Sequence, residues 1–220
     1  MNSRLPAAAE WTPKRLSTMD LPTDCAVLIE DASPQALAMS IDPLPEHGPA
    51  VLTYLYQSAD ASEALASASR LPAKIVDEML FGLEYAAIEL YPAWLPQAAE
   101  IRSPAGAGTA AVRALALRLG AQSSNFGPFV ADLAVRALHH EVPKTSAHAA
   151  AFAAEVRAAG LIRVVAASFG REQVAILVMV PDGLAAAEQR ALATACDWLA
   201  DHGRVGVWLA GARLSAVDWL

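Results

Sequence analysis

The chain has 220 residues and a formal net charge of −7, with 16 basic and 23 acidic side chains. A chain of this length forms one domain or one domain with a small appendage, and its 55% hydrophobic content is unlike that of disordered sequences. The acidic balance excludes the basic surface that binds a nucleic-acid backbone. The apolar run 173–180 ends at Pro181, far short of the roughly 20 residues of a membrane span. We therefore expect neither a nucleic-acid partner nor a membrane.

Residues 1–22 are predicted to form a loosely ordered arm, because prolines recur among mixed polar residues. The arm contains acidic residues and lacks the apolar core of a secretory signal. Cys25 and Cys196 lie far apart and belong to no CxxC motif, as expected in a reducing compartment. We therefore expect a cytoplasmic protein in which residues 23–220 form one α/β domain, with one possible internal boundary near 142–146.

The first ordered elements should be a strand and a helix. Residues 25–30 are an apolar run typical of a buried strand. A helix is predicted to follow, with Ser33 as its N-cap and Pro34 in its first turn, and to stop before Pro43. Residues 50–57 fit either a helix or a strand, and periodicity does not separate the two.

A long amphipathic helix is predicted between Pro72 and Tyr91. Apolar side chains recur at helical spacing on one side, namely Ile75, Val76, Met79, Leu80, Leu83, Ala87 and Leu90. The other side is predicted to carry Asp77, Glu78, Glu84 and Glu89. Residues 85–90 also fit a strand. Further helices are predicted over 61–69, 109–119, 128–140 and 146–159.

The last third of the chain predicts a layer of strands and helices. Two apolar, β-branched runs at 161–168 and 173–180 are separated by Phe-Gly-Arg-Glu, which indicates an antiparallel hairpin. A helix over 184–202 and a strand over 204–210 follow. The predicted fold class is α/β, with a mixed sheet, a C-terminal helix–hairpin–helix–strand layer and a helix-rich N-terminal and middle region.

A glycine-rich segment before the helix at 109–119 is a candidate anion site. Gly106, Gly108 and Thr109 would let an anion approach the free N–H groups and the positive end of the helix dipole. With Ala111 they match the loose G-x-G-x-x-A pattern of dinucleotide loops. Asp132, at the distance of the acidic partner, falls inside a predicted helix, and no lysine completes a Walker A motif. A flexible glycine turn with an N-cap explains the same residues.

Other chemical constellations are weak. The run His139-His140-Glu141 places adjacent ligands about 100° apart on a helix, which does not suit a metal. No G-x-S-x-G elbow is present, and a triad of Ser168, Asp182 and His202 has no support from spacing alone. We therefore predict no metal and no cofactor, and favour a protein that is not an enzyme.

The C-terminal strand is apolar on both faces, which requires either helices on both sides or a partner. The predicted interaction surface consists of Trp208, Leu214, Trp219 and Leu220. The first functional hypothesis is a non-enzymatic interaction or regulatory module of a cytoplasmic, bacterial-type protein, which binds another protein or itself. The alternative is a small-molecule enzyme or sensor that binds a phosphate-containing ligand at Gly106, Gly108 and Thr109.

Overall fold

Two compact units make up the chain in the computed structural model. The structure describes residues 3–5, 22–29, 41–43, 46–58, 69–101, 108–121, 126–141, 151–211 and 214. The first unit, Met1–Asp77 with Gln173–Leu220, contains the strands, and the second, Glu78–Glu172, is helical. We call them the sheet unit and the helical unit. The possible boundary near 142–146 lies outside the described residues, as does the N-terminal arm apart from residues 3–5 and 22.

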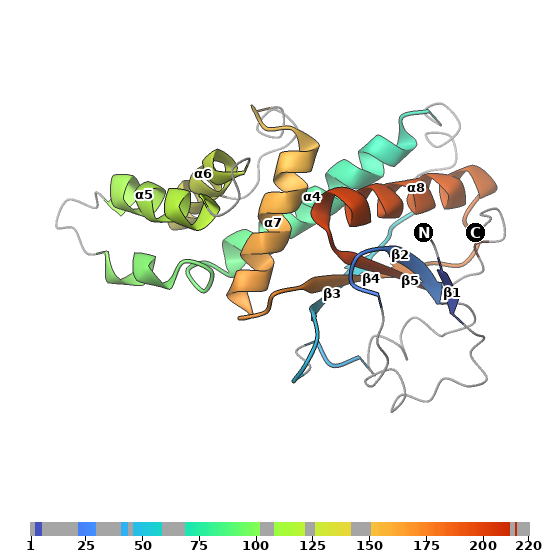
Figure 1. Ribbon diagram of the computed structural model, residues 1–220. Helices are drawn as coiled ribbons and strands as arrows, with labels where there is room; N and C mark the ends of the chain where they lie inside the picture. The colour runs from blue at the N-terminus through green and yellow to red at the C-terminus, as the bar shows by residue number, and fades with distance from the viewer. Residues whose placement is uncertain are drawn as a thin grey trace. The chain divides into compact units, whose positions relative to one another are not determined.

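The sheet unit is built on a parallel sheet (Figure 1). Its strands are β1 (Ser3–Leu5), β2 (Ala26–Ile29), β3 (Ala50–Leu55), β4 (Val174–Val180) and β5 (Gly206–Gly211). They are arranged in the order β1-β2-β5-β4-β3, and every neighbouring pair is parallel. The α/β class is therefore confirmed, and the prediction of a mixed sheet is wrong. Of residues 50–57, for which both a helix and a strand were open, residues 50–55 form strand β3.

Burial on both faces explains the composition of the central strands. In β4, six of seven residues are buried, and none carries a charge. Parallel strands covered on both sides read as continuous apolar runs, as the sequence of β4 does. Helix α8 (Ala186–Gly203) connects β4 to β5 and lies against one face of the sheet, where Leu192, Cys196 and Leu199 are fully buried (Figure 1).

The predicted antiparallel hairpin is wrong, because residues 161–168 belong to helix α7 (Ala154–Ser168). Among the described residues, the helix that was expected at 146–159 is α7, which begins at Ala154 and ends at Ser168. Ile162, Val164 and Val165 are β-branched and favour a strand locally, but they are buried in a segment whose alanines favour a helix. A tight turn joins antiparallel strands only. Both neighbours of β4 are parallel to it, so neither could be connected to β4 by a short turn at 169–172.

The helical unit contains four α-helices of the described chain. They are α4 (Leu71–Glu89), which begins in the residues of the sheet unit, α5 (Gly108–Gly120), α6 (Gly127–Leu138) and α7. A short 3₁₀ helix, η2 (Pro96–Glu100), precedes α5. Residues 85–89 are helical, which settles the open end of the long amphipathic helix. Among the described residues, every helix is too short or too polar to span a membrane.

Glycines let the helices of this unit approach closely. A Cβ atom on Gly120, at the end of α5, would overlap the Cα atom of Gly127 at the start of α6. A Cβ atom on Gly160 of α7 would lie 2.6 Å from Cδ1 of Phe129, a ring that is 1% exposed on α6. The α6 helix is therefore held between two neighbours at positions where a larger residue would force a shift.

Candidate functional site

The exposed side of α4 carries two aromatic side chains one helical turn apart. Phe81 is 42% exposed and Tyr85 is 46% exposed, although the opposite side of the helix is buried. Glu78 and Glu89 are also exposed and extend the same side at spacings of three and four residues, so the four side chains form one stripe. We call these four residues the aromatic face of α4. The sequence analysis did not identify this face. The signal that could have revealed it is the spacing of Phe81 and Tyr85, which places both aromatic residues on the side of the helix opposite its apolar positions.

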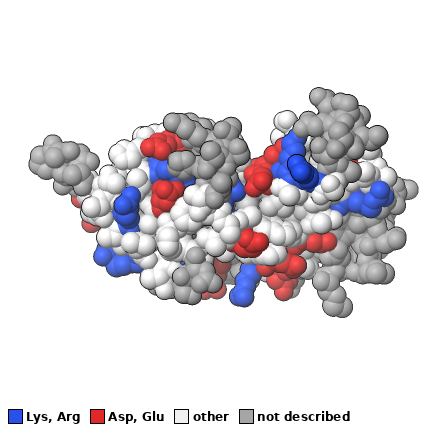
Figure 2. Space-filling view, turned by 90° about the horizontal axis from the view of Figure 1, so that it is seen from above, with Lys and Arg blue, Asp and Glu red and all other residues white. Residues whose placement is uncertain are grey.

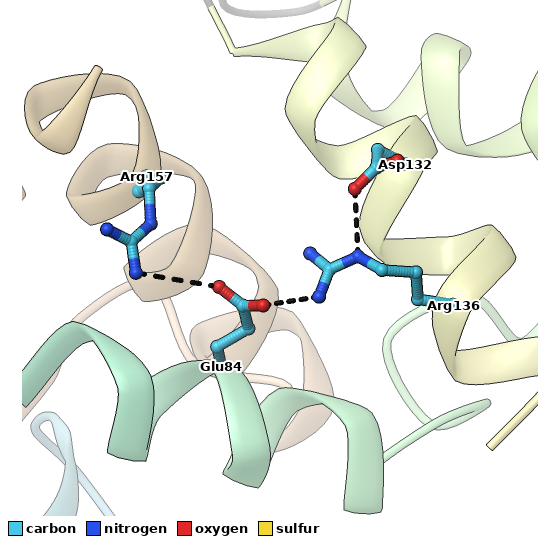
Figure 3. A network of polar contacts seen from close by, with 4 residues as sticks. All are labelled: Glu84, Asp132, Arg136 and Arg157. Atoms are coloured by element: carbon cyan, nitrogen blue, oxygen red, sulfur yellow. Dashed lines mark hydrogen bonds and ion pairs between the residues drawn. The ribbon is translucent and has the colours of Figure 1, made fainter. Parts of the chain in front are cut away.

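Buried ion pairs hold the opposite side of α4 in the helical unit (Figure 3). Glu84 is 6% exposed, so its predicted place on the polar side of the helix is wrong. Its carboxylate accepts a hydrogen bond from Arg136 of α6 and lies 3.7 Å from Nη2 of Arg157 on α7. Arg136 also donates through Nε to Asp132 at 2.8 Å. One carboxylate therefore links three helices.

The protonation of this network follows from its geometry. Burial by itself would lower the pKa of Arg136, but hydrogen bonds and charges from Glu84 and Asp132 outweigh it and raise that pKa above its ordinary value. Arg136 therefore stays charged. Because a buried guanidinium is stabilised only by well-placed carboxylates, the network fixes the positions of α4, α6 and α7 against one another. The aromatic face thus stands on a rigid helix.

A second buried carboxylate lies in the sheet unit, near the carboxyl ends of β3 and β4. Glu188, 2% exposed, sits in the first turn of α8, where the helix dipole favours a negative charge. Tyr56 donates its hydroxyl to Oε1 at 2.9 Å, and Ser58 donates to Oε2 at 3.0 Å. Ligands of parallel sheets often bind at this edge. Here both carboxylate oxygens are engaged by the chain, so Glu188 fastens the segment after β3 to α8.

The candidate anion site is only partly described. Gly106 lies outside the described residues, and Gly108 is the first residue of α5. Gly108 is buried, and a Cβ atom there would point at Ile101, 3.4 Å away. The hydroxyl of Thr109 lies 3.5 Å from Nε2 of His139. Gly108 thus packs against the rest of the chain, whereas the partly exposed Thr109, in the first turn of α5, approaches the exposed His139 at the end of α6.

The predicted interaction surface is also divided. Trp208 is 4% exposed, and its indole N–H donates to the carbonyl oxygen of Pro22 at 2.9 Å. Leu214 is 2% exposed. Neither side chain presents an accessible contact, while Trp219 and Leu220 lie outside the described residues. Packing within the chain accounts for the first two.

The remaining chemical candidates show no activated group. His202 stacks on Trp198 with ring centroids 4.3 Å apart and contacts the carbonyl of that residue through Nδ1, while Asp182 is exposed. Burial raises the pKa of both Cys25 and Cys196, which keeps these thiols protonated. The described residues hold no cluster of three potential metal ligands.

The face shown in Figure 2 has no large patch of one charge among its described residues, because acidic and basic side chains lie interspersed among uncharged ones. Comparisons of the chain with family models, with curated proteins and with solved structures find no match.

Proposed function

We propose that this protein is a non-enzymatic interaction module that binds a partner protein through the aromatic face of α4. The observation that carries the proposal is the exposure of Phe81 and Tyr85, 42% and 46%, on a helix whose other side is buried and ion-paired. Exposed aromatic side chains on a rigid element are typical anchors of protein interfaces. Gly82 is exposed beside them, and its lack of a side chain lets a partner approach the helix.

The partner is a protein segment that carries arginine or lysine. From Asp77 to the end of α4 the helix has no basic residue, and Glu78 and Glu89 flank the aromatic pair. A guanidinium or ammonium group can stack on the ring faces of Phe81 and Tyr85 while it pairs with these carboxylates. Acidic partners would meet like charges at both ends of the face.

Photo-crosslinking from position 81 tests this proposal. With p-benzoylphenylalanine in place of Phe81, irradiation in the native host should give one discrete adduct, whose crosslinked peptide contains arginine or lysine. Combining this replacement with Glu89→Lys should reduce the adduct about tenfold, because it puts a like charge against the partner.

Leu117 supplies the matched control, because it is 42% exposed on α5 and its neighbour Arg118 makes its surroundings basic. The same crosslinker at position 117 should not give this adduct. An identical adduct from both positions, or none from position 81, would show that the aromatic face binds no specific partner.

A second candidate function is the binding of a phosphate-containing ligand at the start of α5. The approach of Thr109 to His139 supports it, because a hydroxyl and an imidazole adjoin the positive end of the helix dipole. If it is correct, a ligand at about 100 times its dissociation constant should stabilise the chain by about 2.7 kcal/mol. A thermal-shift screen of nucleotides, coenzymes and sugar phosphates measures this. A stabilisation that persists in Thr109→Val with His139→Ala, or none at all, removes the candidate.

A further inference from the structure

Among the strands that the structure describes, β3 lies at the edge of the sheet and has a neighbouring strand on one side only. It pairs with β4 alone, with Ala50 opposite Val174 and Leu55 opposite Met179. The amide of Ala50 donates to Gln173, and that of Tyr56 donates to Met179. Backbone groups at 50, 52, 54 and 56 therefore face β4, and those at 51, 53 and 55 face outward.

Only the first half of this outer edge is covered in the described chain. The amide of Val51 donates to the carbonyl oxygen of Pro43 at 2.9 Å. No backbone hydrogen bond between described residues engages the outward groups of Thr53 or Leu55. Both residues are exposed, and Leu55, at 62%, is the most exposed of the large hydrophobic residues described.

The open half also lacks the usual protection of an edge strand. Natural sheets block their edges with charged side chains, prolines or bulges. The sequence of β3, Ala-Val-Leu-Thr-Tyr-Leu, contains no charge and no proline, and its register with β4 runs without a bulge. Such an edge is a template for another strand.

We propose that the open half of β3 pairs antiparallel with the same segment of a second copy of this chain. A two-fold axis beside Tyr54 places Thr53 of each copy opposite Leu55 of the other. The outward N–H and C=O groups of each Thr53 and Leu55 are then satisfied across the axis, as in a hydrogen-bonded antiparallel pair. The contact is isologous, as a closed dimer requires.

The side chains suit this occupant better than an unrelated strand. The axis brings the two Tyr54 rings together at the closer, non-hydrogen-bonded position, where aromatic pairs stabilise antiparallel strands. Although each chain has a net charge of −7, the contacting segment carries none, so like charges do not meet there. Because the contact is small compared with standard interfaces, we expect the dimer to form and dissociate with concentration.

We expect a dissociation constant in the micromolar range, so sedimentation velocity over about 1 to 100 μM of protein tests the dimer. The mass of the wild type should rise with concentration towards twice the 23.1 kDa of the chain. Thr53→Pro removes an N–H group that faces outward and leaves the hydrogen bonds to β4 intact, so it should weaken dimerisation at least about tenfold. Thr53→Val keeps the N–H group and the shape of the side chain, and should dimerise like the wild type.

Leu55→Lys provides a second variant that retains every backbone group and brings two like charges to the contact. It should also shift the wild-type dimer to monomer, and circular dichroism should show that both variants keep the native helical signal. If Thr53→Pro does not fold, Leu55→Lys decides the result alone. A wild type that stays monomeric over the whole range, or a dimer that persists in a folded variant, overturns the proposal. Neither substitution changes the aromatic face of α4, so the outcome is separate from that of the crosslinking experiment.

Discussion

Replacing Glu84 by glutamine should lower the free energy of unfolding by about 3 kcal/mol. The substitution keeps the shape of the side chain but removes the one carboxylate that contacts both Arg136 and Arg157, whose side chains are 8% and 5% exposed. Two buried guanidinium groups then lose the negative charge that they share. Urea unfolding followed by helical circular dichroism measures the change.

Asp132→Asn is the matched control, because it removes a charge from the same network at its exposed end. The side chain of Asp132 is 37% exposed and contacts Arg136 as an i,i+4 pair, so its loss should cost less than about 1 kcal/mol. Equal decreases in the free energy of unfolding of the two variants would show that burial does not increase the contribution of Glu84 to stability.

Replacing Trp208 by alanine should cost about 3 to 5 kcal/mol of stability. The indole is 4% exposed and packs in a buried cluster with Val27, Leu177 and other residues of the sheet. The substitution removes this packing and leaves a cavity, and it also deprives the carbonyl of Pro22 of a donor. Urea unfolding of the sheet unit, followed by near-ultraviolet circular dichroism, measures the loss.

Trp208→Phe separates the two contributions. It keeps most of the apolar contact and removes the indole N–H group, so we expect a loss of about 1 to 2 kcal/mol. Crosslinking from position 81 should be unchanged in this folded variant. Reduced crosslinking with full stability would instead indicate that Trp208 contacts the partner directly.

Local pattern was sufficient for much of the fold. The apolar run of β4 predicts a strand, and the amphipathic spacing of the first part of α4 predicts a helix, because the burial of both follows their own periodicity. Residues 161–168 show where this fails. Their β-branched run has the composition of a strand, and only the packing of α7 within the helical unit selects the helix.

The candidate sites were harder to predict for a related reason. Glu84 has the same residue type as its exposed neighbours Glu78 and Glu89, and its role depends on two arginines far away in the sequence. The sequence leaves the place of Trp208 open, because a tryptophan on a strand with two apolar faces fits either a core or an interface. Which of these applies depends on what covers the face, and a single sequence does not contain that information.

The long crossover between β3 and β4 has a consequence for how the protein is made. Strand β3 ends at Leu55 and its neighbour β4 begins at Val174, with the whole helical unit encoded between them. On a translating ribosome, β3 emerges roughly 10 s before β4 at ordinary elongation rates. The residues of the helical unit are contiguous and emerge during that interval, the last of them directly before β4. Until β4 emerges, the uncharged strand β3 lacks the neighbour with which it pairs, and an unpaired apolar strand of this kind is prone to aggregate.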